Sequence, residues 1–352
     1  MNEMIKNGRI ASFDWLRIVL TFFVIVLHFN NSNGGAALAY TSENPFGHEL
    51  ALLSESICIC AVDAFMILSG YFLCQKQERR ISKVILLFAT VMGYNSFFSI
   101  SNMIVNGNYL LKNYIHSFIP INYFVWLYTV IYLLSPWINI IFNTLDKKKI
   151  RLLLCVCILL FVIYPTVIDI FTGITGTTIN EISTISATDS GAGYTLVNFF
   201  VMYLIGAYLR NYKMNFSPII FVEGYIIGVL LTMITLHFTM NGTYYNNIFV
   251  VISAVFLVLF FQSIRLPKMT VVTTLASLAF PIFIIHPCLY GIWNKFNLEK
   301  WLSGNFFCVL GIYLVANVLM YAVSAGIALI GRFIASPAVK LIDTKVAFKF
   351  RV

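Results

Sequence analysis

The chain has 352 residues, of which 60% are hydrophobic, 16% are aromatic and only 11% are charged. Soluble globular proteins carry about 25% charged residues, so this chain has too few polar side chains to cover a soluble surface. The composition excludes a soluble enzyme, a disordered protein and a secreted disulfide scaffold, and it predicts a protein whose solvent is mostly lipid. The formal net charge of +9 must then be explained by the positions of the basic residues.

Ten stretches of mainly apolar residues follow one another along the chain, and they predict an all-α, polytopic integral membrane protein. The stretches are 12–32, 51–74, 84–105, 121–143, 152–172, 194–210, 217–237, 245–263, 271–294 and 305–332. The stretch 194–210 is short enough to lie aslant or to be partly re-entrant.

The first stretch is predicted to be an uncleaved span and not a signal peptide. It contains Arg17 and His28, and the nearest small-residue cleavage motif lies about ten residues beyond it, which is too far for signal peptidase. We expect residues 1–352 to form a single transmembrane domain with no appended soluble domain.

All but three of the 23 Lys and Arg residues fall on one side of the membrane when the ten spans are threaded alternately. The exceptions are Lys112, Lys295 and Lys300. Because Lys and Arg near span ends stay in the cytoplasm, the sequence predicts that both termini are cytoplasmic. The net charge is therefore explained by topology and does not indicate a nucleic-acid partner.

The seven cysteines lie in or beside apolar runs, at spacings that match no zinc or haem motif. Two pairs, Cys58 with Cys60 and Cys155 with Cys157, are two residues apart and point to opposite sides of a helix, so neither can form a disulfide without unwinding. The sequence predicts no metal site and no redox role for these residues.

Three ionisable residues of the first span lie on one helix face. Arg17 and His28 are eleven residues apart. In an α-helix eleven residues turn through about 20° more than three full turns and rise about 16 Å along the axis. Asp14 lies one turn before Arg17 on the same face. Ionisable residues inside a membrane indicate a functional site, and the alternative interpretation is an interfacial anchoring pair with a helix-packing histidine.

The second span ends in another group of candidate residues. Asp63 is a carboxylate at mid-membrane depth, for which we expect an interior arginine or a histidine as partner. Ser69 and Gly70 are small residues that allow another helix to approach closely. A basic cluster follows, and its alternative interpretation is a short cytoplasmic loop that obeys the positive-inside rule. The cluster consists of Lys76, Arg79, Arg80 and Lys83.

These motifs, in this order, resemble the acyltransferase-3 family of multi-spanning bacterial membrane acyltransferases. The matching segments are Phe13–Arg17 with His28, Asp63–Phe65, Ser69–Tyr71, the basic cluster, Tyr132–Pro136 and Phe283–Pro287. The resemblance extends from about residue 9 to beyond residue 290, and the ten spans usual in the family agree with the number predicted above.

The resemblance implies a membrane O-acetyltransferase that moves an acetyl, or other acyl, group from cytoplasmic acyl-CoA to a hydroxyl of an envelope carbohydrate of the capsule, exopolysaccharide, O-antigen or peptidoglycan type. It implies that His28 is the essential histidine and Arg17 the arginine of the family's Arg-x10-His motif. The family's Arg-x-x-Arg motif falls on Arg80 to Lys83, where lysine keeps the charge and loses the bidentate fork. Residues 122–124 (Asn-Tyr-Phe) also depart from the family, whose members often carry a His-x-Trp-like cluster there.

Roles for the remaining candidates follow from this resemblance and from physical chemistry. The residues expected to bind acyl-CoA are Arg17, Arg79, Arg80 and Lys83, and those expected to support the site are Asp14, Asp63, Ser69, Gly70 and His286. Two chemical roles remain open for His28, a general base on the acceptor hydroxyl or a transient acyl carrier. His286, also in the outer half, is expected either to face His28 or to be a helix-packing residue.

The expected partners are acetyl-CoA as donor substrate, a carbohydrate or lipid-linked sugar as acceptor, and membrane lipid. We expect no permanently bound cofactor and no nucleic acid, and the sequence leaves the oligomeric state open. The expected location is the bacterial cytoplasmic membrane. A transporter or flippase of a lipid-linked sugar is the alternative function, since interior ionisable residues would also suit a substrate pathway.

Overall fold

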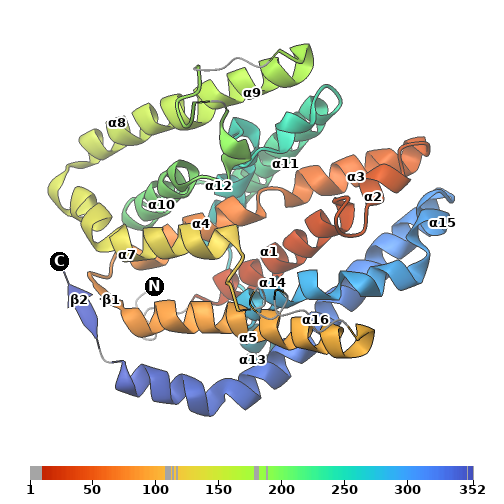
Figure 1. Ribbon diagram of the computed structural model, residues 1–352. Helices are drawn as coiled ribbons and strands as arrows, with labels where there is room; N and C mark the ends of the chain where they lie inside the picture. Colours follow the sequence, from red (N-terminus) through yellow and green to blue (C-terminus); the bar gives the residue numbers. More distant parts are fainter. Residues whose placement is uncertain are drawn as a thin grey trace.

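The computed structural model describes residues 10–107, 112, 115, 118–177, 182–187, 189–346 and 348–351. In this part of the chain the fold is a bundle of α-helices, and its one sheet has two strands of three residues each (Figure 1). The predicted all-α class is confirmed.

Eight helical segments of the described residues are long and apolar enough to cross a membrane. They are α1 (Ala11–Asn30), α3 with α4 (Pro45–Cys58 and Ala61–Leu73), α5 (Ile81–Asn106), α7 (Tyr123–Thr144), α8 with η1 and α9 (Lys147–Ile158, Leu159–Ile163 and Tyr164–Thr175), α11 (Pro218–Leu236), η3 with α12 (Met240–Thr243 and Ile248–Ser263) and α16 (Phe306–Lys345). The polytopic membrane character predicted from the composition is therefore confirmed.

The other two predicted spans take a different form. The ninth is broken: α13 (Thr270–Ser277) is followed, at a bend of 49°, by α14 (Ala279–Ile285) and the 3-10 helix η4 (His286–Phe296). The sixth is α10 (Leu196–Asn211), whose 16 residues rise about 24 Å, less than the ~30 Å hydrocarbon core of a bilayer. Most of its residues are buried, so protein and not lipid surrounds it.

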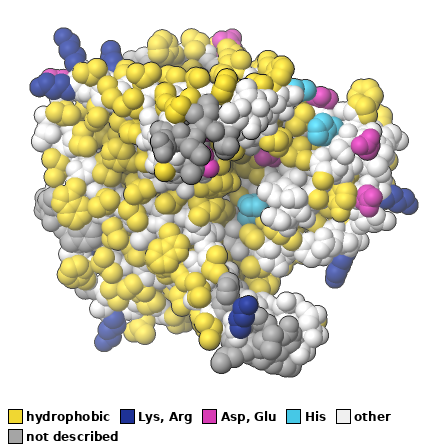
Figure 2. Space-filling view, turned by 45° about the horizontal axis from the view of Figure 1, so that its top comes forward, with side chains coloured by type: hydrophobic (Ala, Val, Ile, Leu, Met, Phe, Trp, Pro, Cys, Tyr) yellow, Lys and Arg dark blue, Asp and Glu magenta, His cyan; other side chains and the backbone are white. Residues whose placement is uncertain are grey.

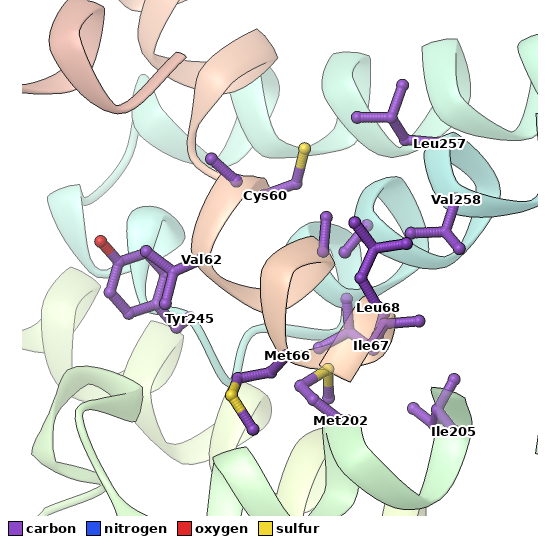
Figure 3. Packing of buried hydrophobic residues seen from close by; sticks show 14 of the residues in the cluster. Cys60, Val62, Met66, Ile67, Leu68, Met202, Ile205, Tyr245, Leu257 and Val258 are labelled. Carbon is purple, nitrogen blue, oxygen red and sulfur yellow. The ribbon is translucent and has the colours of Figure 1, made fainter. Parts of the chain in front are cut away.

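The core of the bundle lies where α4, α10 and α12 meet. Figure 3 shows Met66 and Ile67 of α4 beside Met202 and Ile205 of α10, with Val258 of α12 close to them. All five side chains belong to one buried hydrophobic cluster. Helices α4 and α10, which end near the basic cluster, are therefore held by a buried hydrophobic core.

Two glycines bring α4 and α10 to backbone distance. A Cβ on Gly70 would lie 2.1 Å from the carbonyl oxygen of Tyr203, and a Cβ on Gly206 would lie 2.0 Å from that of Ile67. Such crossings at small residues are common between membrane helices. Ser69, beside Gly70, donates a hydrogen bond of 2.9 Å to a carbonyl oxygen of its own helix.

We call the basic end that end of the bundle where β1 (Glu78–Arg80) pairs antiparallel with β2 (Lys349–Arg351), the strand that follows α16 (Figure 1). The C-terminal ends of α4, α7 and α10 lie there too. Gln75, just after α4, donates a hydrogen bond of 3.1 Å to Asn211 at the end of α10, and Asn139 of α7 donates one of 3.0 Å to the last carbonyl of α4.

The short helices α2 (Ala37–Tyr40) and α15 (Leu298–Leu302) lie at the opposite end, which we call the far end (Figure 1). One further 3-10 turn, η2, spans Gly191–Gly193.

The surface of the bundle is largely hydrophobic in Figure 2, and Lys and Arg side chains lie near the edges of that view. Many large apolar side chains are exposed, among them Phe97, Trp126 and Phe333. This is the surface expected of a protein whose middle is surrounded by lipid.

Candidate active site

Two histidines from distant parts of the chain meet inside the bundle. His28 lies near the end of α1, and His286 is the first residue of η4, where the broken span changes from α to 3-10 geometry. Their atoms His28 Nδ1 and His286 Nε2 are 2.9 Å apart. His286 is fully buried, whereas His28 is partly exposed. The structure therefore brings together the two histidines that the sequence singled out.

The hydrogen-bond partners assign the tautomer of each neutral ring. His286 Nδ1 lies 3.0 Å from the Ile282 carbonyl oxygen, and because a carbonyl only accepts, this nitrogen carries the hydrogen. His286 Nε2 is then an acceptor. His28 Nδ1, which also lies 2.9 Å from the Val24 carbonyl oxygen, must be the donor to both. His28 Nε2 is consequently the nitrogen that keeps a free lone pair.

Aromatic rings and one glycine shape the space around His28. The Tyr290 ring is 5.9 Å from the His28 ring and stacks on Trp293 at 5.2 Å. Gly34 lies so close that a Cβ there would be 1.9 Å from the His28 carbonyl oxygen. The His28 ring is thus bordered by the rings of His286 and Tyr290, and Trp293 lies behind Tyr290.

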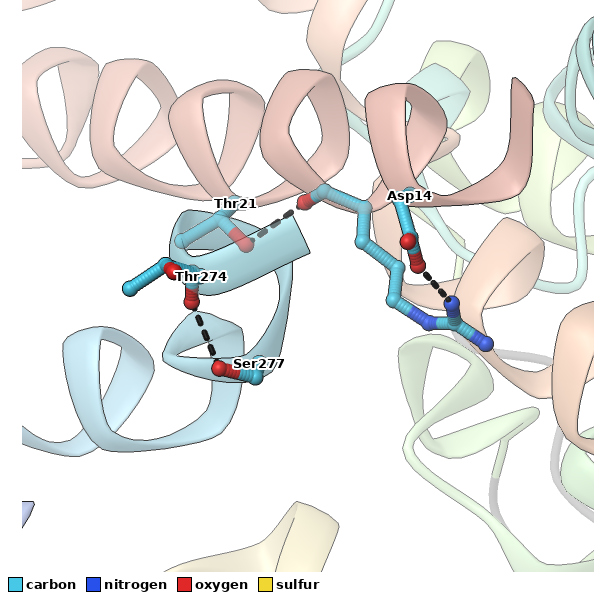
Figure 4. Close-up of polar contacts among 5 residues, drawn as sticks. Asp14, Thr21, Thr274 and Ser277 are labelled. Atoms are coloured by element: carbon cyan, nitrogen blue, oxygen red, sulfur yellow. Dashed lines mark hydrogen bonds and ion pairs between the residues drawn. The ribbon is translucent and has the colours of Figure 1, made fainter. Parts of the chain in front are cut away.

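Arg17 and Asp14 form an ion pair near the start of α1. Arg17 Nη1 donates to Asp14 Oδ1 at 2.9 Å, as Figure 4 shows, and Thr21 donates to the Arg17 carbonyl at 2.7 Å. The guanidinium carbon lies 5.1 Å from the centre of the Phe72 ring. Asp14 is buried and Arg17 is 27% exposed, so this cation is held in place while it remains accessible.

A cavity of about 530 Å³ lies at the basic end. It is lined by Leu73, Lys76, Gln77, Glu78, Arg79, Arg80, Lys83 and Tyr132. It therefore contains the whole basic cluster, and Arg80 is also the residue that precedes the first turn of α5. The positive end of the dipole of this 26-residue helix adds to the charge of the cations. We call this space the basic cavity.

Arg79 differs from the other cations of the basic cavity. It is only 1% exposed, and its guanidinium donates to the Ser135 hydroxyl at 2.6 Å and to backbone carbonyl oxygens of Leu73, Lys76 and Glu78 at 3.1, 2.8 and 2.9 Å. The side chains of Arg80, Lys83 and Lys76 are exposed. Arg79 thus holds the loop together from inside, whereas the other three present their charges to solvent.

Asp63 has a different partner from the one expected. Asn198 donates a hydrogen bond of 2.9 Å to Asp63 Oδ1, and both residues are fully buried. The expectation of an arginine or a histidine is therefore wrong, because α10 places its amide side chain against the first turn of α4. Among the described residues, Asp63 Oδ2 has no hydrogen-bond partner.

A row of aromatic rings connects the basic cavity with the histidines. Tyr132, which lines the cavity, is followed by Tyr128 at 6.2 Å and Phe124 at 6.0 Å along α7. Phe124 contacts Phe283 at 5.5 Å, and Phe283 lies 6.1 Å from the His286 ring. We call these rings the aromatic row. Their spacing of four residues on α7 was visible in the sequence, where it reads as an ordinary helical core stripe.

All seven cysteines are free. Within the part of the chain that the structure describes, no group of three or more His, Cys, Asp or Glu side chains is arranged to hold a metal ion.

The fold and the site define a multi-pass membrane protein with an interior histidine pair and a cationic cavity at one end. The chain belongs to the acyltransferase-3 family, because the model of that family, described as an acyltransferase domain, matches residues 10–335. This match confirms the resemblance seen in the motifs, and it makes the protein a multi-pass membrane acyltransferase. No curated protein and no solved structure matches the chain.

Proposed function

We propose that this acyltransferase takes an acetyl, or other acyl, group from acyl-CoA at the basic end and transfers it to a hydroxyl of an envelope carbohydrate at the far side of the membrane. The observation that carries the proposal is the continuous aromatic row between the basic cavity and the His28–His286 pair. An anionic head group held in the cavity leaves the acyl-bearing arm free to extend along these rings.

The basic cavity suits the phosphates of acyl-CoA. Arg80, Lys83 and Lys76 present exposed cations, and the N-terminus of α5 attracts anions through its dipole and unpaired N–H groups. Arg79 keeps the loop in shape. Arg17, oriented by Asp14, stands where the arm enters the bundle, about 16 Å along α1 from His28.

His28 Nε2 is the atom to which we assign proton transfer. As the acceptor oxygen attacks the thioester carbonyl, Nε2 takes the hydroxyl proton. The new C–O bond forms, the C–S bond breaks, and the proton passes to the sulfur, so CoA leaves as the thiol. His286 accepts the Nδ1–H bond of His28 and holds the ring in this orientation, much as the carboxylate does in a Ser-His-Asp triad.

The orientation in the membrane follows from the same charges. Because Lys and Arg near span ends stay in the cytoplasm, the basic end faces the cytoplasm, where acyl-CoA is made. His28, toward the other end of α1, is then close to acceptors of the capsule, exopolysaccharide, O-antigen or peptidoglycan type, or to their lipid-linked precursors. The corresponding membrane is the bacterial cytoplasmic membrane.

The test compares His28→Ala with His237→Ala, a matched control at the end of α11, outside this site. Cells that produce each variant at equal membrane levels are analysed for O-acetyl groups on envelope carbohydrate by mass spectrometry, and purified proteins are given labelled acetyl-CoA. We expect His28→Ala to lose about 10²- to 10⁴-fold of the transfer rate and the control to keep it.

Full transfer by His28→Ala would contradict the assignment of His28, and lipid-linked sugar transport without any acyl turnover would contradict the proposed function. Label that stays covalently on the protein without acceptor would indicate the acyl-histidine route instead of general base catalysis.

A further inference from the structure

A second cavity, of about 410 Å³, adjoins the basic cavity through Gln77 and Glu78, which line both. It is lined by Cys74, Gln75, Gln77, Glu78, Asn143 and Asn211. Four of these six residues carry a carboxamide, and none is Lys or Arg. We call this space the amide cavity; its volume lies within the range of small-ligand sites, which is about 300–1,000 Å³.

The two cavities differ in electrostatic character. Cys74 directly follows α4, Asn143 lies in the last turn of α7, and Asn211 is the last residue of α10. Three helix C-termini therefore meet at the amide cavity, and cations compensate two of them: Arg79 bonds the last carbonyl of α4, and Arg210 lies in the last turn of α10. The one charged residue that lines the amide cavity is Glu78, whereas four cations line the basic cavity and the N-terminus of α5 adds to their charge.

Carboxamides recognise purine bases through their donor and acceptor edges. Asn and Gln bind adenine with two hydrogen bonds, one to N7 and one from the N6 amino group. Adenine is uncharged, so its site needs no cation, and its amino group can donate to a carboxamide oxygen. A nucleotide with its base here and its phosphates next door would match both cavities.

We infer that the amide cavity binds the adenine of the acyl-CoA donor, while the adjoining basic cavity binds its phosphates. This inference rests on the proposed function, because it assumes that the donor is a CoA thioester. Asn143 is the main specificity residue, because its side chain is exposed and the amide group of that side chain makes no hydrogen bond to the described residues. Asn211 already donates to the Ala207 carbonyl at 2.9 Å and accepts from Gln75, so it shapes the cavity.

The experiment measures displacement of labelled acetyl-CoA from the detergent-purified full chain. The competitors are adenosine 3′,5′-bisphosphate and the inosine analogue, in which a carbonyl oxygen replaces the 6-amino group. For the wild-type protein we expect the adenosine compound to compete about tenfold better, the effect of one lost hydrogen-bonding edge. Asn143→Ala should remove most of this preference, and Thr144→Ala, the neighbouring exposed residue outside the cavity, should keep it.

Three outcomes would overturn the inference. Equal competition by the two compounds at the wild-type protein would show that the 6-amino group is not recognised. An unchanged preference in Asn143→Ala would remove this cavity from base recognition. Failure of the wild-type protein to bind acetyl-CoA at all would contradict the proposed function itself, and this inference with it.

Discussion

Arg79 and Arg80 are adjacent cations of one cluster, and the structure predicts opposite consequences when each is replaced by alanine. Arg79 is buried, and its guanidinium donates hydrogen bonds to the loop after α4, to the last carbonyl of α4 and to Ser135 of α7. Arg80 is exposed in the basic cavity. Arg79→Ala should therefore destabilise the fold, whereas Arg80→Ala should weaken donor binding without destabilising it.

The size of the Arg79 effect follows from what its partners retain. The Arg79 guanidinium also donates to the Tyr132 carbonyl at 3.2 Å. The carbonyl oxygens of Leu73 and Lys76 accept from Asn139 as well, and that of Tyr132 accepts from Ser135, so these three oxygens keep one donor. The loss is then the buried cation network and its packing, near the lower end of the range for such groups, about 3 kcal/mol. Replacement of the exposed Arg80 should stay within about 0.5 kcal/mol.

The assay combines thermal unfolding of the detergent-purified variants with binding of labelled acetyl-CoA. We expect a lower unfolding temperature for Arg79→Ala, and for Arg80→Ala a wild-type temperature with roughly tenfold weaker binding, the effect of one charged hydrogen bond to phosphate. Wild-type stability of Arg79→Ala would refute the structural role, and unchanged affinity of Arg80→Ala would remove that side chain from the donor site.

Three more predictions follow from the geometry. Gly206→Ala places a methyl group 2.0 Å from a carbonyl oxygen of α4, so it should lower the unfolding free energy by about 1–3 kcal/mol; an equally stable variant in chemical denaturation would contradict the close crossing. His286→Ala should lower kcat of transfer by about 10²-fold with little change in donor KM, because His28 loses the acceptor for its Nδ1–H; a pure KM effect would argue against this positioning role. The pKa of His237 is raised by a carbonyl of the preceding turn and by Glu49, 3.0 Å away, so this pair should add a small stability that is complete below about pH 6.5 and is lost as the pH rises through the raised pKa. Unfolding temperatures of wild type and His237→Ala should therefore differ at pH 5.5 and coincide at pH 9, and a difference of equal size at both would refute the titration.

The part of the site that depends on a single helix could be predicted from the sequence. The shared face of Arg17 and His28 needs only the helical repeat, and the position of the basic cluster needs only the end of a span. The side chains within that cluster could not be sorted, because the burial of Arg79 depends on carbonyls and a hydroxyl of α4 and α7 that meet only in the folded bundle.

Contacts between segments far apart in the chain could not be predicted from the sequence, for the same reason. Nothing about Asn198 marks it as the partner of Asp63, 135 residues away, since an amide in an apolar run has many possible neighbours. The contact between His28 and His286 joins residues 258 positions apart, and the sequence left it as one of two interpretations of His286. The tautomers of the two rings could be assigned only once the positions of two backbone carbonyls were known. The short buried α10 and the bend before η4 likewise arise from packing and not from local composition.

The pairing of β1 with β2 implies that the basic cavity is completed only late in the synthesis of the chain. The rim of the cavity at Glu78–Arg80 is made early, but its partner strand, Lys349–Arg351, lies beyond the family match that ends at residue 335, and the Phe348 carbonyl also accepts from the first amide of α5 at 3.2 Å. At translation rates of about 5–20 residues per second, the early strand waits on the order of tens of seconds for its partner. A chain still being inserted into the membrane thus has an incomplete rim on its basic cavity, and the finished rim appears only when synthesis has passed residue 351.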